Sequence, residues 1–260
     1  MVDVHCHILS EMDDGAASFE QSVAMAEMAV ADGITHVVAT PHSNSEYRFD
    51  FAAVQRAAKR LQEAVGERLK IATGSDFHLS PENIAALKTN PSPFCIHQKD
   101  YLLVEFNDFA IPPAMDQTLY EIQLAGLRPI ITHPERNPIL RSQPNRLEQW
   151  VRNGCYGQVT GGSLTGVFGS NARQMAQRWI ARGLVHFVAS DAHNTTTRPH
   201  QLRMAYDVVK RDFGEAKAAA LLVENPLAAF EGRALPHVPE IRDEPAKKKR
   251  LRFFKFGYCE

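Results

Sequence analysis

Residues 2–7, VDVHCH, form a short apolar run that ends in two histidines. If this run is a β-strand, residues two apart point to the same face, so the side chains of His5 and His7 enter one space. Neutral imidazole is a ligand for zinc, iron, nickel and manganese-type ions. The pair alone is equally consistent with two hydrogen-bonded structural histidines. It indicates a metal site only if further ligands recur at the ends of other strands.

Six further runs of β-branched or apolar residues follow along the chain, and each is expected to be a strand. Helical segments lie between them. The first begins at Ser18, which forms a capping-box pattern with Gln21, and ends at Gly33. Strands that alternate with helices pair in parallel through βαβ units, so the sequence predicts an α/β fold whose seven strands form a closed or nearly closed barrel. The six further strands cover residues 36–40, 70–74, 101–104, 129–132, 157–159 and 185–189.

Length and composition place the chain among ordinary globular proteins. It has 260 residues, of which 44% are hydrophobic and 23% are charged, enough for one large domain with a sizeable core. We expect a barrel domain at residues 1–235 and a basic, aromatic tail at residues 236–260. The sequence shows neither an apolar run long enough to span a bilayer nor an N-terminal secretory signal, so we expect a cytoplasmic location.

The net charge of −1 conceals two regions of opposite sign. Residues 247–260 hold six Lys or Arg and one Glu, so this segment carries +5 and residues 1–246 carry −6. The acidic body argues against nucleic acid as a partner. In the tail, basic residues are interleaved with aromatic ones. This is typical either of a solvated tail or of a segment that contacts an acidic partner or anionic lipid, here at the inner face of the membrane.

Candidate metal ligands recur at the carboxyl ends of the expected strands. In a barrel these positions converge on one cup, although here they are scattered between residues 5 and 193. A mixture of histidines and carboxylates suits manganese, iron or zinc better than magnesium or calcium. Five histidines and four carboxylates are also more than one ion needs. The candidates are His5, His7, Asp14, His42, Asp76, Glu105, His133, Asp191 and His193.

The charge of this set favours binding of phosphate. Three divalent ions would leave a surplus of about +2 over the four carboxylates, which would hold a hydroxide and an incoming phosphate group. Arginine binds two phosphate oxygens at once. Arg136 and Arg198 follow His133 and His193 closely enough to reach the same mouth of the barrel. A surface salt bridge is the alternative role for either arginine.

Several short motifs together resemble the polymerase-and-histidinol-phosphatase (PHP) superfamily. Their order and spacing are most similar to its bacterial protein-tyrosine phosphatases of capsule and exopolysaccharide synthesis, over roughly residues 1–230. The motifs are Asp3-x-His5-x-His7, Asp13-Asp14-Gly15, Thr40-Pro41-His42, Glu105, His133-x-Glu135-Arg136 and Ser190-Asp191-x-His193-Asn194.

This resemblance implies a distorted (β/α)7, TIM-like barrel with three divalent ions, often manganese, with iron, zinc or magnesium as alternatives. It gives Arg136 and Arg198 a phosphate-binding role. Position 76 is usually glutamate in the family, so the shorter Asp76 puts the bridging role in question; nearby His78 would either assist or be a surface loop residue. By the same likeness, His5, His7, Asp76 and Asp191 would bind one ion, Asp76, Glu105 and His133 a second, and Asp14, His42 and His193 the third.

The implied activity is that of a metal-dependent phosphoric monoester hydrolase. Its substrate would be phosphotyrosine on a bacterial tyrosine kinase that regulates capsular or exopolysaccharide synthesis. The alternatives are a small-molecule phosphatase of the histidinol-phosphate type and a non-catalytic metal-binding PHP module.

The cysteines argue against a thiol-based mechanism. Thiol-based tyrosine phosphatases need an arginine six positions after the cysteine, and none follows Cys6, Cys95 or Cys155 at that spacing; Cys259 has no residue there. We therefore expect direct attack by a metal-activated hydroxide on phosphorus, without a covalent intermediate.

Overall fold

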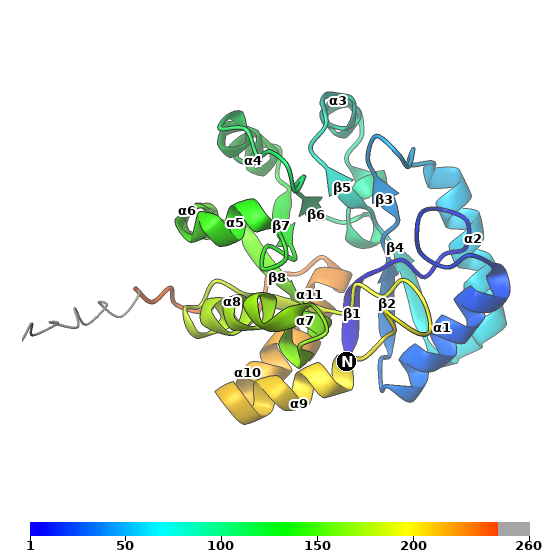
Figure 1. Cartoon of the computed structure of the whole chain (residues 1–260). Helices are drawn as coiled ribbons and strands as arrows, with labels where there is room; N and C mark the ends of the chain where they lie inside the picture. Colours follow the sequence, from blue (N-terminus) through cyan, green and yellow to red (C-terminus); the bar gives the residue numbers. More distant parts are fainter. Residues whose placement is uncertain (244–260) are drawn as a thin grey trace, which may run out of the picture.

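The structure is a computed structural model, and it describes residues 1–243. Short parallel strands form a ring at its centre, and helices surround the ring (Figure 1). The strands are β1 (Val2–Cys6), β2 (His36–Ala39), β3 (His42–Ser43), β4 (Lys70–Thr73), β5 (Asp76–His78), β6 (Tyr101–Glu105), β7 (Arg128–Thr132), β8 (Tyr156–Thr160) and β9 (Phe187–Ala189).

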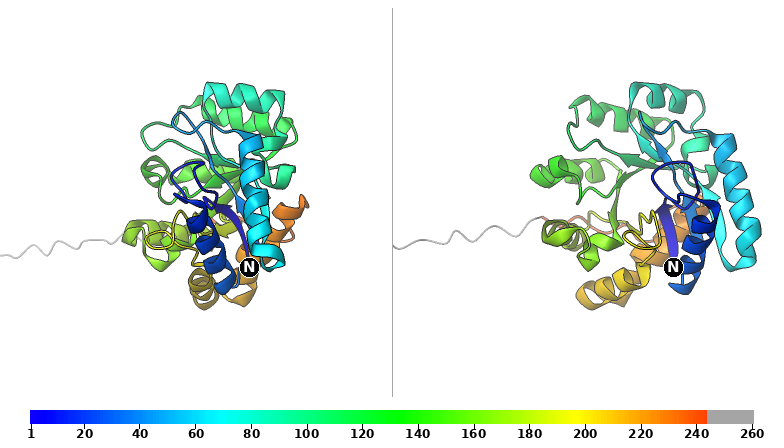
Figure 2. Two further views of the ribbon diagram at one scale, coloured as in Figure 1. Left: turned by 90° about the vertical axis from the view of Figure 1, so that its right-hand side faces the viewer. Right: turned by 45° about the vertical axis from the view of Figure 1, so that its right-hand side comes forward.

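The helices lie outside the strands in each view (Figure 2). The predicted first cap is confirmed, because Ser18 Oγ accepts a hydrogen bond from the backbone N–H of Gln21 at 3.3 Å. The helices are α1 (Phe19–Ala31), α2 (Phe51–Val65), α3 (Pro81–Thr89), α4 (Ala114–Leu124), α5 (Pro138–Ser142), α6 (Pro144–Arg152), α7 (Gly161–Thr165), α8 (Gly169–Ala181), α9 (Leu202–Phe213), α10 (Glu215–Ala219) and α11 (Asn225–Glu231). Shorter 3-10 turns cover Gly66–Arg68, Ser92–Phe94 and Ile96–Gln98, and a π-helical turn covers Ala220–Glu224.

Two of the expected strands are broken where they reach the site. The sheet β1-β2-β4 ends at the register pair Ala39 and Thr73, and the sheet β3-β5-β6-β7-β8-β9 begins at the pair His42 and Asp76. Pro41 has no N–H for the ladder between these pairs. The sequence interpretation that His42 and Asp76 end strands is therefore wrong in detail, since both residues begin a second short strand.

The two sheets form one continuous ring. The chain runs directly from β2 into β3 and from β4 into β5, so these four short strands occupy two positions beside β1, β6, β7, β8 and β9, seven in all. Residues just after β9 close the ring onto β1: the N–H of Asp191 donates to the carbonyl of His5 at 2.9 Å, and that of His7 to Ala192 at 2.8 Å. The predicted distorted (β/α)7 barrel is confirmed.

A bulge in β1 aims the two histidines at the barrel interior. The register with β2 shifts between Asp3 and Cys6, so β1 has one extra residue there. Val4 packs in the cluster lined by β2, β6, β7 and β9, whereas Cys6 packs in the larger cluster that includes residues of the surrounding helices. Without the bulge both side chains would point to the same face. The bulge therefore lets apolar side chains fill the lower barrel while the histidines that follow line its upper end.

Residues after β9 cover the other end of the barrel. α11 packs against the interior cluster through Ala228, Ala229 and Phe230. The chain then continues along the surface, where the N–H of Arg242 donates to the carbonyl of Arg182 at 2.9 Å. Among the described residues, no helix is long and apolar enough to cross a membrane. The basic segment at residues 247–260 lies outside the described residues.

Candidate metal centre

The nine candidate ligands meet at one end of the ring. His42 and Asp76 begin the short strands β3 and β5, and the other seven come from the carboxyl ends of β1, β6, β7 and β9 or from the loops that follow these strands. Their donor atoms form three overlapping groups, within each of which all atoms lie within 4.8 Å of one another. The groups are His5, His7 and Asp76; Asp76, Glu105 and His133; and His7, Asp14, His42 and His193. Asp191 joins the first group, because its Oδ1 lies 3.5 Å from His5 Nε2 and 3.4 Å from His7 Nε2.

The distances between donor atoms are those of ligands around an ion. His5 Nε2 lies 3.3 Å from His7 Nε2 and 3.4 Å from Asp76 Oδ2, and 3.4 Å separates His133 Nε2 from the nearer oxygen of Glu105. These separations exceed an ordinary hydrogen bond of about 2.7–3.2 Å. Two ligands that each lie about 2.1 Å from one ion at the tetrahedral angle are about 3.4 Å apart. The donor set therefore fits divalent metal ions.

Three of the histidines are held by their far nitrogen. Nδ1 of His5 lies 3.0 Å from Gln158 Oε1, and Nδ1 of His7 lies 2.6 Å from Asp13 Oδ2. Nδ1 of His193 lies 2.9 Å from the carbonyl oxygen of Asp191. When Nδ1 donates to these oxygens, Nε2 presents its lone pair to the centre, as is usual for histidines that bind metals. The imidazoles are thus oriented in advance.

Asp76 is buried without the partners that a carboxylate needs. Its side chain is fully buried, and neither oxygen accepts a hydrogen bond. Its Oδ2 instead lies 3.4 Å from both His5 Nε2 and His42 Nδ1. A buried, unpaired carboxylate is costly, whereas a bound cation would satisfy it. Asp76 therefore reaches the centre despite its short side chain.

The electrostatics of the site favour a bound cation. Burial works to lower the pKa of His7, but Asp13 outweighs it and raises this pKa to about 9. Burial acts in the same direction on His42, and contacts with Asp14 and Glu105 raise its pKa to about 11. The Glu105 carboxyl is buried, yet His42 and His78 hold its pKa well below the ordinary value. The Glu105 carboxylate is therefore ionised, and binding of metal ions would displace protons from His7 and His42.

The two candidate phosphate-binding arginines meet at Asp191. Its Oδ2 contacts Arg136 Nη1 and accepts a hydrogen bond from Arg198 Nη2 at 2.6 Å, while its Oδ1 faces His5 and His7. One carboxylate thus joins the arginines to the histidines.

The backbone is unusual at the residues that carry these groups. His133 and Asp191 have positive φ angles of 29° and 53°, a conformation that residues other than glycine rarely adopt. Such geometry clusters at functional sites. Gly15 is required for a different reason: a Cβ there would lie 2.1 Å from the carbonyl oxygen of His7. The loop with Asp14 can approach β1 only because residue 15 is glycine.

Sequence analysis missed three residues that touch the ligands. Asp13 was quoted in a motif but given no role, Gln158 was not singled out, and His78 was left open between a site role and the surface. A polar residue inside a strand was the available signal for Gln158. His200 is also buried, and its Nδ1 lies 3.1 Å from Asp3 Oδ2.

Two cavities open beside the centre, and both are lined by Glu105. One, of about 540 Å³, is also lined by His78 and by apolar residues that include Leu79, Ile84, Phe106 and Met115. The other, of about 250 Å³, is lined by residues that include Arg136, His133, Arg141 and Phe168. The guanidinium carbon of Arg136 lies 4.3 Å from the centre of the Phe168 ring. The site therefore has an apolar side and a basic side.

Fold and donor set define a barrel metalloprotein with its site at the strand ends. The model of the family "Capsular polysaccharide synthesis, CpsB/CapC" matches residues 1–231, and the chain belongs to that family. The predicted resemblance to capsule-type proteins is confirmed at this level.

Curated relatives match along most of their length. Tyrosine-protein phosphatase YwqE from Bacillus subtilis (strain 168) is 35% identical over 262 residues, which cover 99% of this chain and 100% of YwqE. Tyrosine-protein phosphatase CpsB from Streptococcus pneumoniae is 30% identical over 239 residues, which cover 87% of this chain and 96% of CpsB.

Solved structures show the same fold. A crystal structure from a study of YwqE and CpsB, described as unique metal-dependent tyrosine phosphatases, superposes with a TM-score of 0.87 at 34% identity and covers 94% of this chain and 100% of its own. An organophosphorus hydrolase mutant has a TM-score of 0.59 at 14% identity, covers 88% of this chain and 92% of its own, and shares the fold alone.

Proposed function

We propose that this protein is a metal-dependent protein-tyrosine phosphatase that acts on a bacterial tyrosine kinase controlling capsular or exopolysaccharide synthesis. One observation carries the proposal: Asp191 faces metal-type ligands with one oxygen and two arginines with the other. A phosphate group bound there would meet cations from both sides. The names of the curated relatives support the same activity.

The side chains divide the work of phosphate hydrolysis. Ions held by the nine ligands would activate water and polarise the phosphoryl oxygens. Arg136 and Arg198 bind the equatorial oxygens and offset their growing negative charge. If they released Asp191 Oδ2, the two guanidinium groups would have N–H donors free for the phosphate. Oδ1 of Asp191, which faces His5 and His7, would remain available to hold an ion.

The apolar cavity supports an aromatic substrate. Its walls at Leu79, Ile84, Phe106 and Met115 suit the ring of phosphotyrosine, while Glu105 and His78 connect it to the ligand cluster. The phosphate of a tyrosine whose ring lies in this cavity would extend toward the ligands. A peptide chain would pass over the rim.

The ions are proposed to be three in number and to be manganese, with iron, zinc or magnesium as alternatives. The three overlapping groups formed by the nine candidate ligands support the number. The mixture of imidazole and carboxylate supports the identity. Asp76 would bridge the first and second ions, because it belongs to two of the groups.

A cysteine nucleophile finds no support among the described residues. Cys6, Cys95 and Cys155 are buried, and burial raises the pKa of the Cys6 thiol well above the usual range and that of Cys95 to about 12. A catalytic thiol needs the opposite shift.

The test compares three substrates with added Mn²⁺: a phosphotyrosine peptide, histidinol phosphate and a single-stranded oligonucleotide. We expect the peptide to be hydrolysed fastest and chelation to abolish turnover, while Cys6→Ser keeps most of it. Full activity after thorough metal removal would contradict the proposal. Preference for histidinol phosphate would favour the small-molecule alternative, and no turnover of any substrate would favour the non-catalytic one.

The domain boundary at residue 235 and the role of the basic tail remain predictions. We propose that residues 247–260 contact anionic lipid or an acidic partner at the inner face of the membrane, because this segment combines six basic residues with aromatic ones. Deleting residues 246–260 should reduce binding to vesicles that contain phosphatidylserine. Unchanged binding would refute the lipid version.

A further inference from the structure

His78 lies against the expected ligand set without belonging to it. It ends β5, two residues after Asp76. Side chains two residues apart in a strand point to the same face, so His78 and Asp76 share one face of β5. In the pairing of β5 with β6, His78 is the register partner of Glu105. Its Nε2 is in direct contact with Glu105 Oε2.

The two oxygens of Glu105 face different histidines. Oε1 lies 3.4 Å from His133 Nε2, whereas Oε2 lies 3.4 Å from His42 Nδ1 and contacts His78 Nε2. Donor atoms of His42, His78 and Glu105 all lie within 4.8 Å of one another. Two imidazoles are therefore available on the Oε2 side of Glu105.

His42 can serve only one ion, because a neutral imidazole has a single lone pair. Its Nε2 lies 3.4 Å from Asp14 Oδ1, in the group that also contains His7 and His193. When Nε2 binds an ion there, Nδ1 carries a proton and faces Asp76 and Glu105 as a donor. His42 then offers no lone pair to an ion on the Oε2 side of Glu105, and His78 Nε2 is the imidazole nitrogen in contact with that oxygen.

We propose that His78 is a ligand of an ion at Glu105, on the Oε2 side of that carboxylate. This role of His78 extends the proposed function and depends on it only for the identity of the ion. His78 and Glu105 both line the apolar cavity, so an ion bound between them would border the space proposed for an aromatic substrate. The competing role for His78 is that of a hydrogen-bond donor that only positions Glu105.

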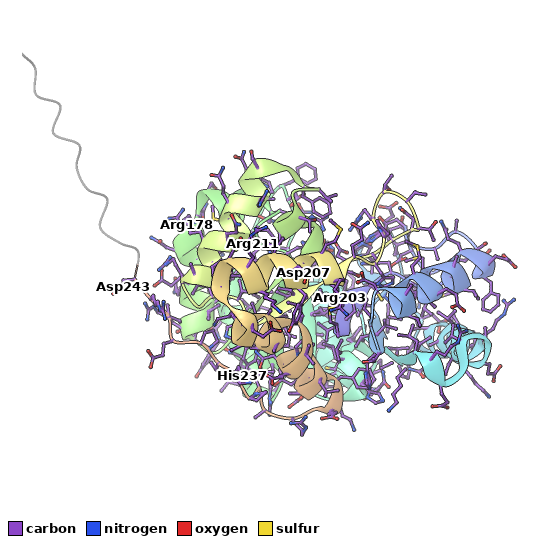
Figure 3. All side chains as sticks on the ribbon, turned by 90° about the horizontal axis from the view of Figure 1, so that it is seen from below. Arg178, Arg203, Asp207, Arg211, His237 and Asp243 are labelled. Carbon is purple, nitrogen blue, oxygen red and sulfur yellow. The ribbon has the colours of Figure 1, made fainter. Side chains whose placement is uncertain are left out.

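Metal binding by the full-length protein distinguishes these roles without any substrate. His78→Ala removes both the ligand and the donor, whereas His78→Gln keeps an N–H near Glu105 but removes the imidazole. His237→Ala is a matched control, since His237 also pairs with a glutamate, Glu224, but does so at the outer surface (Figure 3). The measurements are Mn²⁺ titration by calorimetry and metal content after dialysis, with circular dichroism to confirm folding.

We expect both His78 variants to lose at least about tenfold in affinity at one of the sites, with a lower metal content, while His237→Ala binds like the wild type. Pulsed EPR of the Mn²⁺-loaded protein should show fewer imidazole nitrogen couplings in His78→Gln. Wild-type affinity in either variant, or unchanged nitrogen couplings, would overturn the proposal. Phosphatase activity does not enter these measurements, so their outcome is independent of the proposed reaction.

Discussion

The two sides of the metal centre differ in how far hydrogen bonds hold their ligand side chains in place. On the side of β1 and β9, His5, His7 and His193 each have Nδ1 fixed by an oxygen acceptor. On the side of β3 and β5, His42 Nδ1 and both oxygens of Asp76 are buried without a hydrogen-bond partner.

This difference indicates which part of the site needs the ions to keep its geometry. The β1 and β9 side is ordered by the protein itself, so it should keep its geometry in the metal-free state. The β3 and β5 side holds the two unsatisfied oxygens of Asp76, which are stable only when a cation pairs with them. Metal binding should therefore stabilise the second side more than the first.

The largest effect on activity should come from removing a ligand on the β1 and β9 side. His5→Ala removes a nitrogen that lies within 3.5 Å of His7, Asp76 and Asp191 donors. We expect hydrolysis of a phosphotyrosine peptide to fall by about a thousandfold or more, as for loss of a central catalytic group. His36→Ala, at the start of β2 and outside the candidate set, should leave activity unchanged. Comparable rates for the two variants would show that the centre has been misassigned.

The arginines should give the next largest effect. Arg136→Ala and Arg198→Ala each remove a donor for the phosphoryl oxygens, so kcat should fall by about 100- to 1,000-fold while metal content stays the same. Lysine at either position should restore only part of the rate, since it lacks the two-pronged geometry. Steady-state kinetics with metal analysis checks this. A change in metal content with normal kcat per bound metal would contradict it.

Weakening a contact that orients a histidine should have a smaller effect than removing a ligand or an arginine. Asp13→Asn weakens the contact that orients His7, and we expect the affinity for Mn²⁺ to fall by about 10- to 100-fold. The matched control is Asp207→Asn, on the outer face of α9 (Figure 3). Calorimetric titration compares the two. Equal affinities would mean that the β1 side does not depend on its fixed imidazoles.

The smallest predicted effect is on stability as a function of pH. In the metal-free protein the raised pKa of His7, about 9 against 6.5, contributes stability that is fully present below pH 6.5 and is lost as the pH rises through about 9.

Metal binding reverses this trend, because an ion needs the neutral imidazole and displaces its proton. Stabilisation by Mn²⁺ should therefore increase between pH 6.5 and 9 while the metal-free protein becomes less stable. Thermal unfolding of both forms across this range tests the sign. A metal-free protein that gains stability toward pH 9 would contradict the assignment of the His7–Asp13 pair.

Much of the fold could be predicted because local patterns and tertiary structure agree. The runs at residues 101–104 and 129–132 lie in strands, and the cap at Ser18 forms as expected. The breaks before His42 and Asp76 could not be predicted from apolar runs, since they depend on how the two strands pair across Pro41. The bulge in β1 likewise appears only in the register with β2.

The candidate ligands could be predicted from residue type and from their positions near the ends of the expected strands. All nine candidates converge, because the ends of parallel strands meet at one end of a barrel. The supporting residues were not predictable in the same way. Gln158 acts through a contact across 153 residues of sequence, and His78 through its register with Glu105; neither relation has a local signature.

The most direct test of the account is an anomalous diffraction measurement on crystals of the protein grown with Mn²⁺, recorded on both sides of the manganese absorption edge. The account predicts three anomalous peaks at the strand ends, one in each of the donor groups around His5, Glu105 and Asp14. Electron density that shows these side chains ordered with no anomalous peak between them, or peaks elsewhere on the molecule, would contradict it.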